Sequence, residues 1–360
     1  MYSTEIKDIY GNLQDDLSRK IFECKFFYLL TGNTKFIRKM IEANYNEYDI
    51  EAFNLFIKWV ERIQSGYKGI IVYGAGLYGE VISSYFDKKK IVAVCDSNKD
   101  KQDTVVFGHK VISLEQLQTR YSSNDYFVLV TILNKKSERT VYQNLINLGF
   151  NENRMIGIGM VFHALQANLK FKHQYFLSFL KPDLDEVFID AGCLDFDTSI
   201  DFIKWSSPRG EYERIVAFEP DQKQYSFCVE QSKKVKNATV HPYALWNEST
   251  ELSFVNDLAG SAHITNNADG VKVKAVKLDD ILNGQKATFI KMDIEGAELN
   301  ALKGAEQTIL KYRPKLAICI YHKLDDIVEI PQYILSLHSD YRLYIRHHGL
   351  FTAETVLYAT

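Results

Sequence analysis

Hydrophobic residues in the first part of the chain recur at three- and four-residue spacing, the period of an α-helix. Ile21, Phe22 and Phe26 share one such face, and Phe53 with Phe56 shares another. The Gly32-Asn33 pair breaks the pattern. We therefore predict a helical N-terminal segment over residues 1–66, whose aromatic residues form a core or a surface for a second copy of the chain.

Residues 67–160 change to short apolar runs that alternate with helical stretches. The runs Gly69–Tyr73, Ile91–Cys95 and Tyr126–Thr131 are typical of buried strands, and Ser137–Leu148 has the pattern of a helix. Strands that alternate with helices form parallel sheets with right-handed crossovers. The sequence predicts a Rossmann-like domain here.

A predicted helical linker over residues 161–186 precedes a second series of strands and helices, residues 187–360. Its strands are predicted at Val187–Asp190, Ile215–Glu219, Thr239–Ala244, Phe289–Asp293, Leu316–Tyr321, Arg342–His347 and Val356–Ala359. An insertion after the third strand holds two β-like runs, Glu251–Val255 and Val271–Leu278. The last two strands are joined through His348-Gly349-Leu350-Phe351, and the eight residues between them leave no room for a crossover helix, so we expect an antiparallel hairpin. The predicted fold is α/β, with two tandem Rossmann-like domains after the helical segment.

The composition excludes several classes of protein. The 360 residues are 46% hydrophobic and 25% charged, which is ordinary for globular domains, and the net charge of −3 gives no general attraction to nucleic acid or anionic membrane. The longest apolar run is far shorter than the roughly 20 residues of a membrane helix. The N-terminus lacks the pattern of a signal peptide, so we expect a cytoplasmic protein. Five cysteines without a CxxC pair are expected to be buried and reduced.

Three segments of the second series place candidate functional residues at the ends of strands. Asp190 and Gly192 end the first strand, and glycine lets a ligand approach the backbone closely. Glu219 ends the second strand, where an acid can accept the two hydroxyls of a ribose. The fourth strand ends at Asp293 and Glu295, which share a strand face with Lys291. Because ligands bind at the carboxyl ends of parallel strands, we expect these groups to converge.

These segments resemble the FkbM-type methyltransferases, which use S-adenosylmethionine. The matching pieces run in order through residues 187–325: FIDAG, VAFEPD, HPYALW, GSAHI, KLDDIL, IKMDIEGAELNALKGAE and PKLAICIYH. The resemblance implies a class I methyltransferase fold with a seven-stranded sheet whose last strand is antiparallel.

The resemblance also implies roles for individual residues. Asp190 and Gly192 would line the methionine moiety of the cofactor, with Asp195 and Thr198 nearby at the start of a helix. Glu219 would hold the ribose, and Ala244 would lie by the adenine. Asp293 would face the methyl-transfer zone.

One position departs from the family pattern. Where the family commonly has a second glycine in the first loop, this chain has Phe196. A large side chain at this position is expected to narrow the cofactor cleft or to move the loop.

The catalytic candidates are Asp293, Glu295 and His322. His322 follows the fifth strand, and a histidine near its ordinary pKa of about 6.5 suits the removal of a proton from an acceptor. A histidine that merely caps the strand end is the structural alternative. Asp293 and Glu295 could instead hold a divalent cation, as carboxylates do in some O-methyltransferases. The His347-His348 pair is expected at the surface or at the substrate rim.

The first Rossmann-like domain carries a dinucleotide-binding pattern of its own. Gly74, Gly76 and Gly79 follow a strand and precede a helix, and Asp96 ends the next strand. Three interpretations stay open at this point: these residues bind a nucleotide or nucleotide-sugar, they shape a scaffold, or they bind NAD for catalysis.

The sequence thus favours an S-adenosylmethionine-dependent methyltransferase that O-methylates a hydroxyl of a sugar, a nucleotide-linked sugar or a glycan precursor. The expected partner is a small-molecule or glycan acceptor, and a homo-oligomer is compatible with the aromatic N-terminal face. We expect no nucleic acid and no membrane span. The alternatives are a nucleotide-sugar oxidoreductase that uses NAD in the first Rossmann-like domain, and a non-catalytic scaffold with a degenerate methyltransferase fold.

Overall fold

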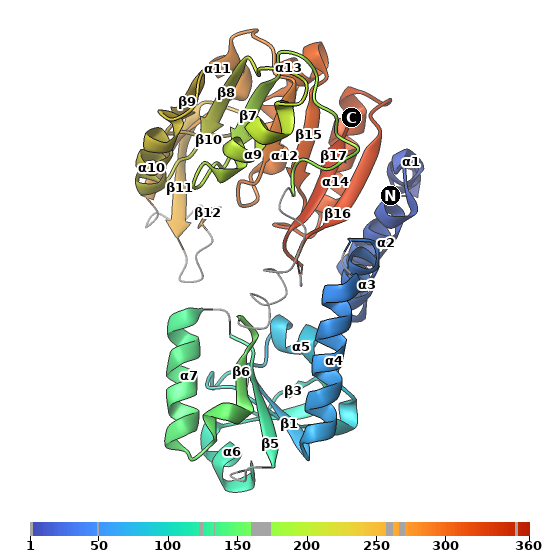
Figure 1. Ribbon diagram of the computed structural model, residues 1–360, viewed down its shortest axis with the longest axis vertical. Coiled ribbons are helices and arrows are strands. Elements are labelled where there is room, and N and C mark those ends of the chain that lie inside the picture. The colour runs from blue at the N-terminus through green and yellow to red at the C-terminus, as the bar shows by residue number, and fades with distance from the viewer. Residues whose placement is uncertain are drawn as a thin grey trace. The chain divides into compact units, whose positions relative to one another are not determined.

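The computed structural model describes residues 3–48, 50–121, 125–132, 134–159, 174–256, 262–265, 271–349 and 352–360. The chain forms two compact units, one of residues 1–29 with 171–360 and the other of residues 30–170 (Figure 1). The predicted N-terminal segment is divided between them. Helices α1 (Ser3–Asn12) and most of α2 (Asp16–Thr31) belong to the first unit, and α3 (Lys35–Tyr48) and α4 (Ile50–Gly66) to the second. No helix in the described ranges is long and apolar enough to cross a membrane.

The unit of residues 30–170 contains a six-stranded sheet in the order β3-β4-β2-β1-β5-β6. The strands are β1 (Gly69–Tyr73), β2 (Ile91–Cys95), β3 (Val105–Val106), β4 (His109–Ile112), β5 (Tyr126–Val130) and β6 (Met155–Gly157). The helices that follow α4 are α5 (Leu77–Ser83), η1 (Lys88–Lys90), α6 (Leu114–Tyr121), α7 (Lys135–Asn147) and η2 (Glu152–Arg154). All pairings are parallel except that of β3 with β4. This confirms the parallel sheet that the strand–helix alternation predicted.

The other unit is built on a seven-stranded sheet in the order β16-β17-β15-β14-β7-β8-β9 (Figure 1). Its strands are β7 (Val187–Ala191), β8 (Arg214–Phe218), β9 (Ala238–His241), β14 (Phe289–Met292), β15 (Lys315–Cys319), β16 (Leu343–His347) and β17 (Thr355–Ala359). Its later helices are α9 (Asp197–Ser206), α10 (Gln222–Ser232), α11 (Leu278–Leu282), α12 (Glu298–Lys303), α13 (Glu306–Tyr312) and α14 (Asp326–Leu337). Only β17 runs antiparallel to its neighbours, β15 and β16. The predicted α/β fold and its terminal hairpin are confirmed.

The strand order places a switch point between β7 and β14, because successive strands continue to β8 and β9 on one side and to β15 on the other. Loops leave a parallel sheet in opposite directions at such a point, and the crevice between them is where open α/β sheets bind ligands.

The insertion between β9 and β14 forms a separate four-stranded sheet in the order β10-β13-β11-β12. Its strands are β10 (Ala244–Leu245), β11 (Thr250–Asn256), β12 (Ala262–Thr265) and β13 (Val271–Val276). The two β-like runs predicted in the insertion are therefore the antiparallel neighbours β11 and β13.

The predicted helical linker is not helical where the structure describes it. Residues 160–173 lie outside the described residues, and residues 174–186 form turns. The buried rings of Phe176 and Phe188 lie 5.7 Å apart, and Phe176 also packs on Phe289 at 5.4 Å. Aromatic burial against β7 and β14 thus outweighs helix propensity here, and the segment is part of the core of the seven-stranded sheet.

Helices α1 and α2 are attached to the edge strand β16. Leu13 forms a parallel bridge with Leu343, and the Ile345 amide donates to Ser18 Oγ at 2.9 Å. Arg346, which is buried, donates to Asp15 Oδ2 at 2.6 Å. These contacts satisfy polar groups that an open sheet edge leaves unpaired, which explains why the first helices group with the C-terminal sheet.

Candidate active site at the switch point

The glycine loop after β7 is pressed against the end of β14. Gly192 has φ +77°, and a Cβ on it would lie 2.0 Å from the carbonyl oxygen of Asp293. The Gly192 and Cys193 amides both donate to the Phe218 carbonyl, at 3.0 and 3.1 Å. Only glycine fits this approach, so the residue brings the ends of β7, β8 and β14 together.

Phe196 occupies the same loop without entering the cleft. Its φ is +72°, in the left-handed region that glycine adopts without cost. Its side chain is fully buried in the core cluster that includes Cys193 and Phe202. The expected narrowing of the cofactor cleft is therefore wrong, because the ring is fully buried in this core cluster.

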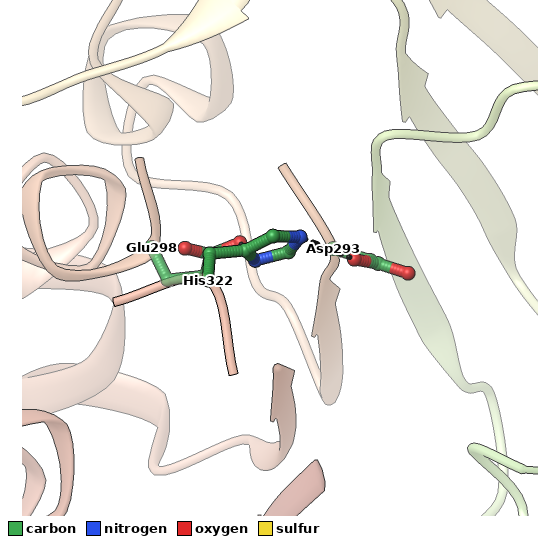
Figure 2. A group of neighbouring side chains, drawn as sticks. All are labelled: Asp293, Glu298 and His322. Carbon is green, nitrogen blue, oxygen red and sulfur yellow. Dashed lines mark ion pairs between the residues drawn. The ribbon is translucent and has the colours of Figure 1, made fainter. Parts of the chain in front are cut away.

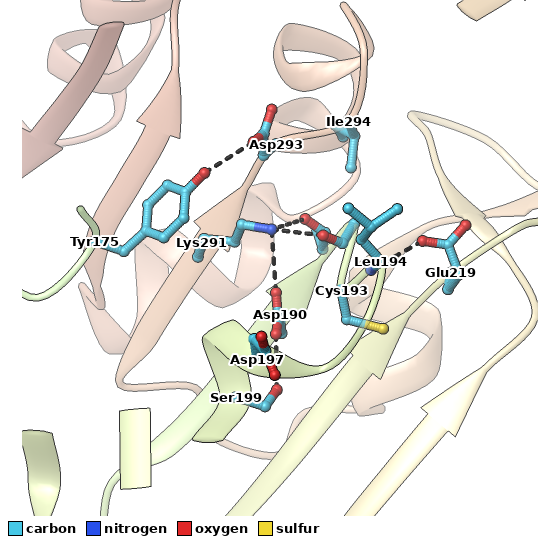
Figure 3. A network of polar contacts seen from close by, with 12 residues as sticks. Tyr175, Asp190, Cys193, Leu194, Asp197, Ser199, Glu219, Lys291, Asp293 and Ile294 are labelled. Carbon is cyan, nitrogen blue, oxygen red and sulfur yellow. Dashed lines mark hydrogen bonds and ion pairs between the residues drawn. The ribbon is translucent and has the colours of Figure 1, made fainter. Parts of the chain in front are cut away.

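Beneath the loop lies a buried ion pair. Lys291 Nζ lies 3.2 Å from Asp190 Oδ1 and donates to the carbonyls of Ala191 and Gly192 at 3.1 and 2.6 Å (Figure 3). Burial alone would lower the pKa of Lys291, but Asp190 and Asp293 outweigh it and raise that pKa to about 12. The ammonium thus fixes the backbone of the glycine loop.

Asp190 has no exposed surface, and its Oδ2 accepts a hydrogen bond from Ser199 Oγ at 2.7 Å. The expectation that Asp190 lines the methionine moiety does not fit this burial. The carboxylate supports the loop through its ion pair with Lys291. This pairing was not predicted, although alternation along the strand placed Lys291 at the same sheet edge.

Glu219 follows β8 and is 7% exposed. Its Oε2 accepts from the Leu194 amide at 3.1 Å and its Oε1 from the Asp221 amide at 2.9 Å. Burial raises the pKa of Glu219 above its ordinary value, with the two amides acting in the opposite direction. The carboxylate is therefore oriented by the backbone of the glycine loop and of the turn before α10 (Figure 3).

The remaining cofactor candidates lie near helix and strand ends. Asp195 is exposed and accepts from the Asp197 amide at 3.1 Å at the start of α9, and Thr198 is half-buried in the first turn of that helix. Ala244 is 8% exposed in β10 of the four-stranded sheet, where it pairs with Ala275.

Asp293 is held on both of its carboxylate oxygens. Tyr175 donates to its Oδ2 at 2.8 Å (Figure 3). Tyr321 donates to its Oδ1 at 3.0 Å. Burial opposes ionisation, but Lys291, His322 and the two tyrosines outweigh it and lower the pKa of Asp293. A carboxylate held on both oxygens has a fixed direction as well as a fixed charge.

Sequence reasoning missed both tyrosines. Tyr321 stands directly before His322 at the end of the fifth strand, so the argument used for His322 applied to it as well. Tyr175 has no local signal, because it lies in the turns before β7, 118 positions from Asp293.

His322 lies among three carboxylates. Its Nδ1 is 3.0 Å from Glu298 Oε1, and its Nε2 is 3.4 Å from Glu295 Oε2 and 3.6 Å from Asp293 Oδ1. In Figure 2 the ring stands between Glu298 and Asp293. Burial alone would lower the pKa of His322, but the surrounding acids raise it to about 10.

This environment corrects the expected base role of His322. The prediction assumed a pKa near 6.5, whereas an imidazole with a pKa of about 10 is protonated at neutral pH and has no lone pair to take a proton. The ring is a cation that holds Asp293, Glu295 and Glu298 together.

The two histidines of the terminal hairpin are not at the surface. His347 is 1% and His348 6% exposed. His347 Nδ1 lies 2.9 Å from Thr355 Oγ1, and His348 Nε2 lies 2.8 Å from Tyr358 Oη. The expectation of a surface or rim position was wrong, because the β16–β17 pairing buries both rings.

In the glycine motif of the other unit, Gly74 and Gly79 are required by close backbone and side-chain contacts. A Cβ on Gly74, which has φ +118°, would lie 2.4 Å from Thr131 Oγ1, and one on Gly79 would lie 2.3 Å from the Gly74 carbonyl oxygen. Asp96 accepts from the Ala75 amide at 2.9 Å and lies 3.5 Å from Lys101 Nζ. Gly76 has no such close contact, the nearest atom being Lys101 Nζ at 3.8 Å. The interpretation of Gly74, Gly76, Gly79 and Asp96 as nucleotide-binding stays a prediction.

Comparison with known proteins agrees with the geometry of the seven-stranded unit. Residues 194–350 match the model of the methyltransferase FkbM domain, and residues 66–156 match that of the C2185-like N-terminal domain. No curated protein matches the chain. Atoms of Asp293, Glu298 and His322 lie within 4.8 Å of one another, a spacing that a metal ion could use, but no comparison supports the expected divalent cation.

Solved structures match the chain at low sequence identity and with TM-scores below 0.5. The methyltransferase FkbM from Methylobacillus flagellatus KT is 20% identical, over 91% of this chain and 100% of that chain, with a TM-score of 0.48. An rRNA methylase from Streptococcus thermophilus is 13% identical, over 52% and 92%, with a TM-score of 0.34. Aeropyrum pernix fibrillarin in complex with S-adenosyl-L-methionine is 9% identical, over 52% and 71%, with a TM-score of 0.33. Residues 194–350, which contain strands β8 to β16 in chain order, therefore match the methyltransferase FkbM domain.

Proposed function

We propose that the chain is an S-adenosylmethionine-dependent methyltransferase that O-methylates a hydroxyl of a sugar, a nucleotide-linked sugar or a glycan precursor. The observation that carries the proposal is the Asp293 carboxylate, oriented by Tyr175 and Tyr321 at the end of β14 and next to the glycine loop. The FkbM domain match supports the reaction class.

The residues around the glycine loop fit the cofactor. Each oxygen of Glu219 accepts one backbone amide, which leaves a second lone pair on each for the two hydroxyls of a ribose. Gly192 keeps the loop free of a side chain, and Asp195 and Thr198 stand at the start of α9, where free amides favour a carboxylate. S-adenosylmethionine supplies a methyl group activated by a sulfonium. Glu219 and Gly192 would hold it, and Ala244 is the proposed neighbour of the adenine.

On the acceptor side, Asp293 is suited to bind the reacting hydroxyl. As a hydroxyl oxygen forms a bond to the methyl carbon, the carbon–sulfur bond breaks and the hydroxyl proton becomes strongly acidic. A carboxylate with a lowered pKa is then a sufficient base, and Asp293 takes that proton. The products are the methyl ether, S-adenosylhomocysteine and one proton.

The surroundings of Asp293 favour a polyhydroxylated acceptor. Gln174 donates to Glu354 Oε2 at 2.9 Å and to Tyr175 Oη at 3.2 Å. The His322 imidazolium lies 3.6 Å from Asp293 Oδ1. Carboxylate, amide and imidazolium groups offer both hydrogen-bond acceptors and donors, which neighbouring hydroxyls of a sugar ring can use together. Glu295 adds a further carboxylate to this edge.

The test combines titration calorimetry with a methyl-transfer assay on the full chain. We expect S-adenosylmethionine to bind the parent protein, Glu219→Ala to weaken that binding at least tenfold, and Asp293→Asn to bind normally but to transfer methyl groups from labelled cofactor to a panel of nucleotide-sugars at least 100-fold more slowly. Asp340→Asn, a change of the same chemistry at an exposed Asp that pairs with Arg313, is the matched control. Binding of NAD with redox turnover, and none of S-adenosylmethionine, would establish the oxidoreductase alternative instead.

A further inference from the structure

Two buried thiols meet beneath the glycine loop. Cys193 Sγ and Cys228 Sγ lie 3.4 Å apart although 35 positions separate the residues. Cys193 follows Gly192 in the loop after β7, and Cys228 lies in α10, the helix that begins after Glu219. The pair therefore joins the two segments that form the proposed cofactor site.

The thiols are connected to the binding groups by hydrogen bonds. Cys228 Sγ donates to the Leu194 carbonyl at 3.2 Å, and the Leu194 amide donates to Glu219 Oε2 at 3.1 Å. A change at the sulfurs thus reaches the proposed ribose-binding carboxylate through a single residue.

We propose that Cys193 and Cys228 form a reversible disulfide when the protein meets a hydroperoxide, and that this bond weakens the cofactor site. One thiol loses its proton and its sulfur attacks the peroxide oxygen, so that the O–O bond breaks, water leaves and a sulfenic acid forms. The second thiol attacks that sulfur and displaces a second water. Two thiols and one hydrogen peroxide give one disulfide and two waters.

The disulfide requires the loop to move. Its sulfur–sulfur bond is about 2.05 Å long, well over 1 Å shorter than the 3.4 Å of the thiol pair. The bond also removes the S–H that Cys228 donates to Leu194. The loop has little freedom to absorb the shift, because Leu194 and Phe196 are both left-handed and Gly192 is in contact with Asp293. We expect Leu194 and Glu219 to be displaced together.

Access to the thiols depends on the loop. Cys193 is 2% and Cys228 0% exposed, whereas Leu194, whose carbonyl accepts from Cys228 Sγ, is 56% exposed. The hydrogen bond to Cys228 and burial raise the pKa of the Cys193 thiol, so that oxidation requires the loop to open. A cofactor that holds the loop closed should slow the oxidation. At equilibrium, the factor by which the disulfide weakens cofactor binding equals the factor by which the cofactor disfavours the disulfide. This coupling rests on the proposed function; disulfide formation does not.

The experiment uses the reduced full chain treated with graded hydrogen peroxide, with and without S-adenosylmethionine. Intact mass and peptide mapping score the 193–228 cross-link, and titration calorimetry measures cofactor affinity before oxidation, after it and after dithiothreitol. We expect the cross-link as the main first product, its formation at least fivefold slower with cofactor, and a cofactor affinity at least tenfold lower until dithiothreitol restores it. In Cys228→Ser, peroxide should form no 193–228 cross-link and should not lower the cofactor affinity. Cys24→Ser, at a buried cysteine of α2, should keep both the cross-link and the loss of affinity.

Each result decides one part of the proposal. Oxidation that leaves Cys193 and Cys228 uncrosslinked overturns the disulfide, and a cross-linked protein with unchanged cofactor affinity overturns its effect on the site. If the reduced protein does not bind S-adenosylmethionine, the proposed function and the coupling fail together, while the mass measurement still decides whether the disulfide forms.

Discussion

The hydroxyl of Tyr175 lies 2.8 Å from Asp293 Oδ2, across 118 positions of sequence. Tyr321 holds the other oxygen of the same carboxylate at 3.0 Å. The side chain that we propose to bind the acceptor is therefore aimed by two groups from different parts of the chain, one before β7 and one after β15.

Removal of the Tyr175 or Tyr321 hydroxyl should make the orientation of Asp293 less fixed and should leave cofactor binding intact. A hydrogen bond to a charged group contributes roughly 1.5–3 kcal/mol, so Tyr175→Phe and Tyr321→Phe should each lower kcat by about tenfold or more, with little change in cofactor affinity. Steady-state kinetics and titration calorimetry measure the two effects. Tyr333→Phe, which removes a 2.9 Å bond to Glu306, is the matched control and should leave kcat unchanged. Equal losses in all three variants would refute the positioning role.

Stability should depend on pH through His322. Its pKa is about 10 in the folded chain against an ordinary 6.5, so the folded state holds the proton more tightly. The stabilisation is fully present below pH 6.5 and is lost as pH rises through about 10. The free energy of unfolding of His322→Gln should be lower than that of the parent by roughly 3 kcal/mol at pH 6, and the gap should shrink toward pH 10. Urea unfolding at a series of pH values measures it. A gap that does not change with pH would contradict the charged state assigned to the ring.

Gly192→Ala should disrupt the proposed cofactor loop. The new Cβ would lie 2.0 Å from the Asp293 carbonyl oxygen, and the residue would keep φ +77°, which costs about 1 kcal/mol in addition to the clash. We expect a loss of measurable S-adenosylmethionine binding and a lower melting temperature. Gly284→Ala is a suitable control, since Gly284 has a similar φ of +76° but nothing within 4 Å of its Cβ position. If both variants bind the cofactor equally well, the close approach is not what the site requires.

Phe196→Gly tests whether the residue belongs to the core or to the cleft. Glycine would relieve the left-handed backbone by about 1 kcal/mol, but removal of a fully buried ring costs roughly 3–5 kcal/mol. We therefore expect a net loss of roughly 2–4 kcal/mol in the free energy of unfolding, with unchanged cofactor affinity in the fraction that is folded. Chemical denaturation and calorimetry provide the two numbers. Tighter cofactor binding in the glycine variant would show that the ring obstructs the cleft after all.

The sequence by itself determined the fold class and the edge of the sheet at which the site lies. Apolar runs that alternate with helical stretches dictate parallel strands, and a connection too short for a crossover helix dictates the final hairpin. Because the carboxyl ends of parallel strands share one edge, Gly192, Glu219 and Asp293 could be placed together from their positions at strand ends alone. The Gly192 turn and the strand-end acids are local features, and a sequence pattern predicts local features directly.

The tertiary structure alone decided which partner each of these groups has, and with it their chemistry. Nothing near Asp293 in sequence indicates Tyr175, and nothing near Asp190 indicates that Lys291 neutralises it below the loop. His322 looked like a base of ordinary pKa until its three carboxylate neighbours were in place. Phe196 looked like an obstruction until its ring was seen in the core. A pKa and a side-chain direction depend on burial and on charges brought together from distant strands, and those are properties of the folded chain.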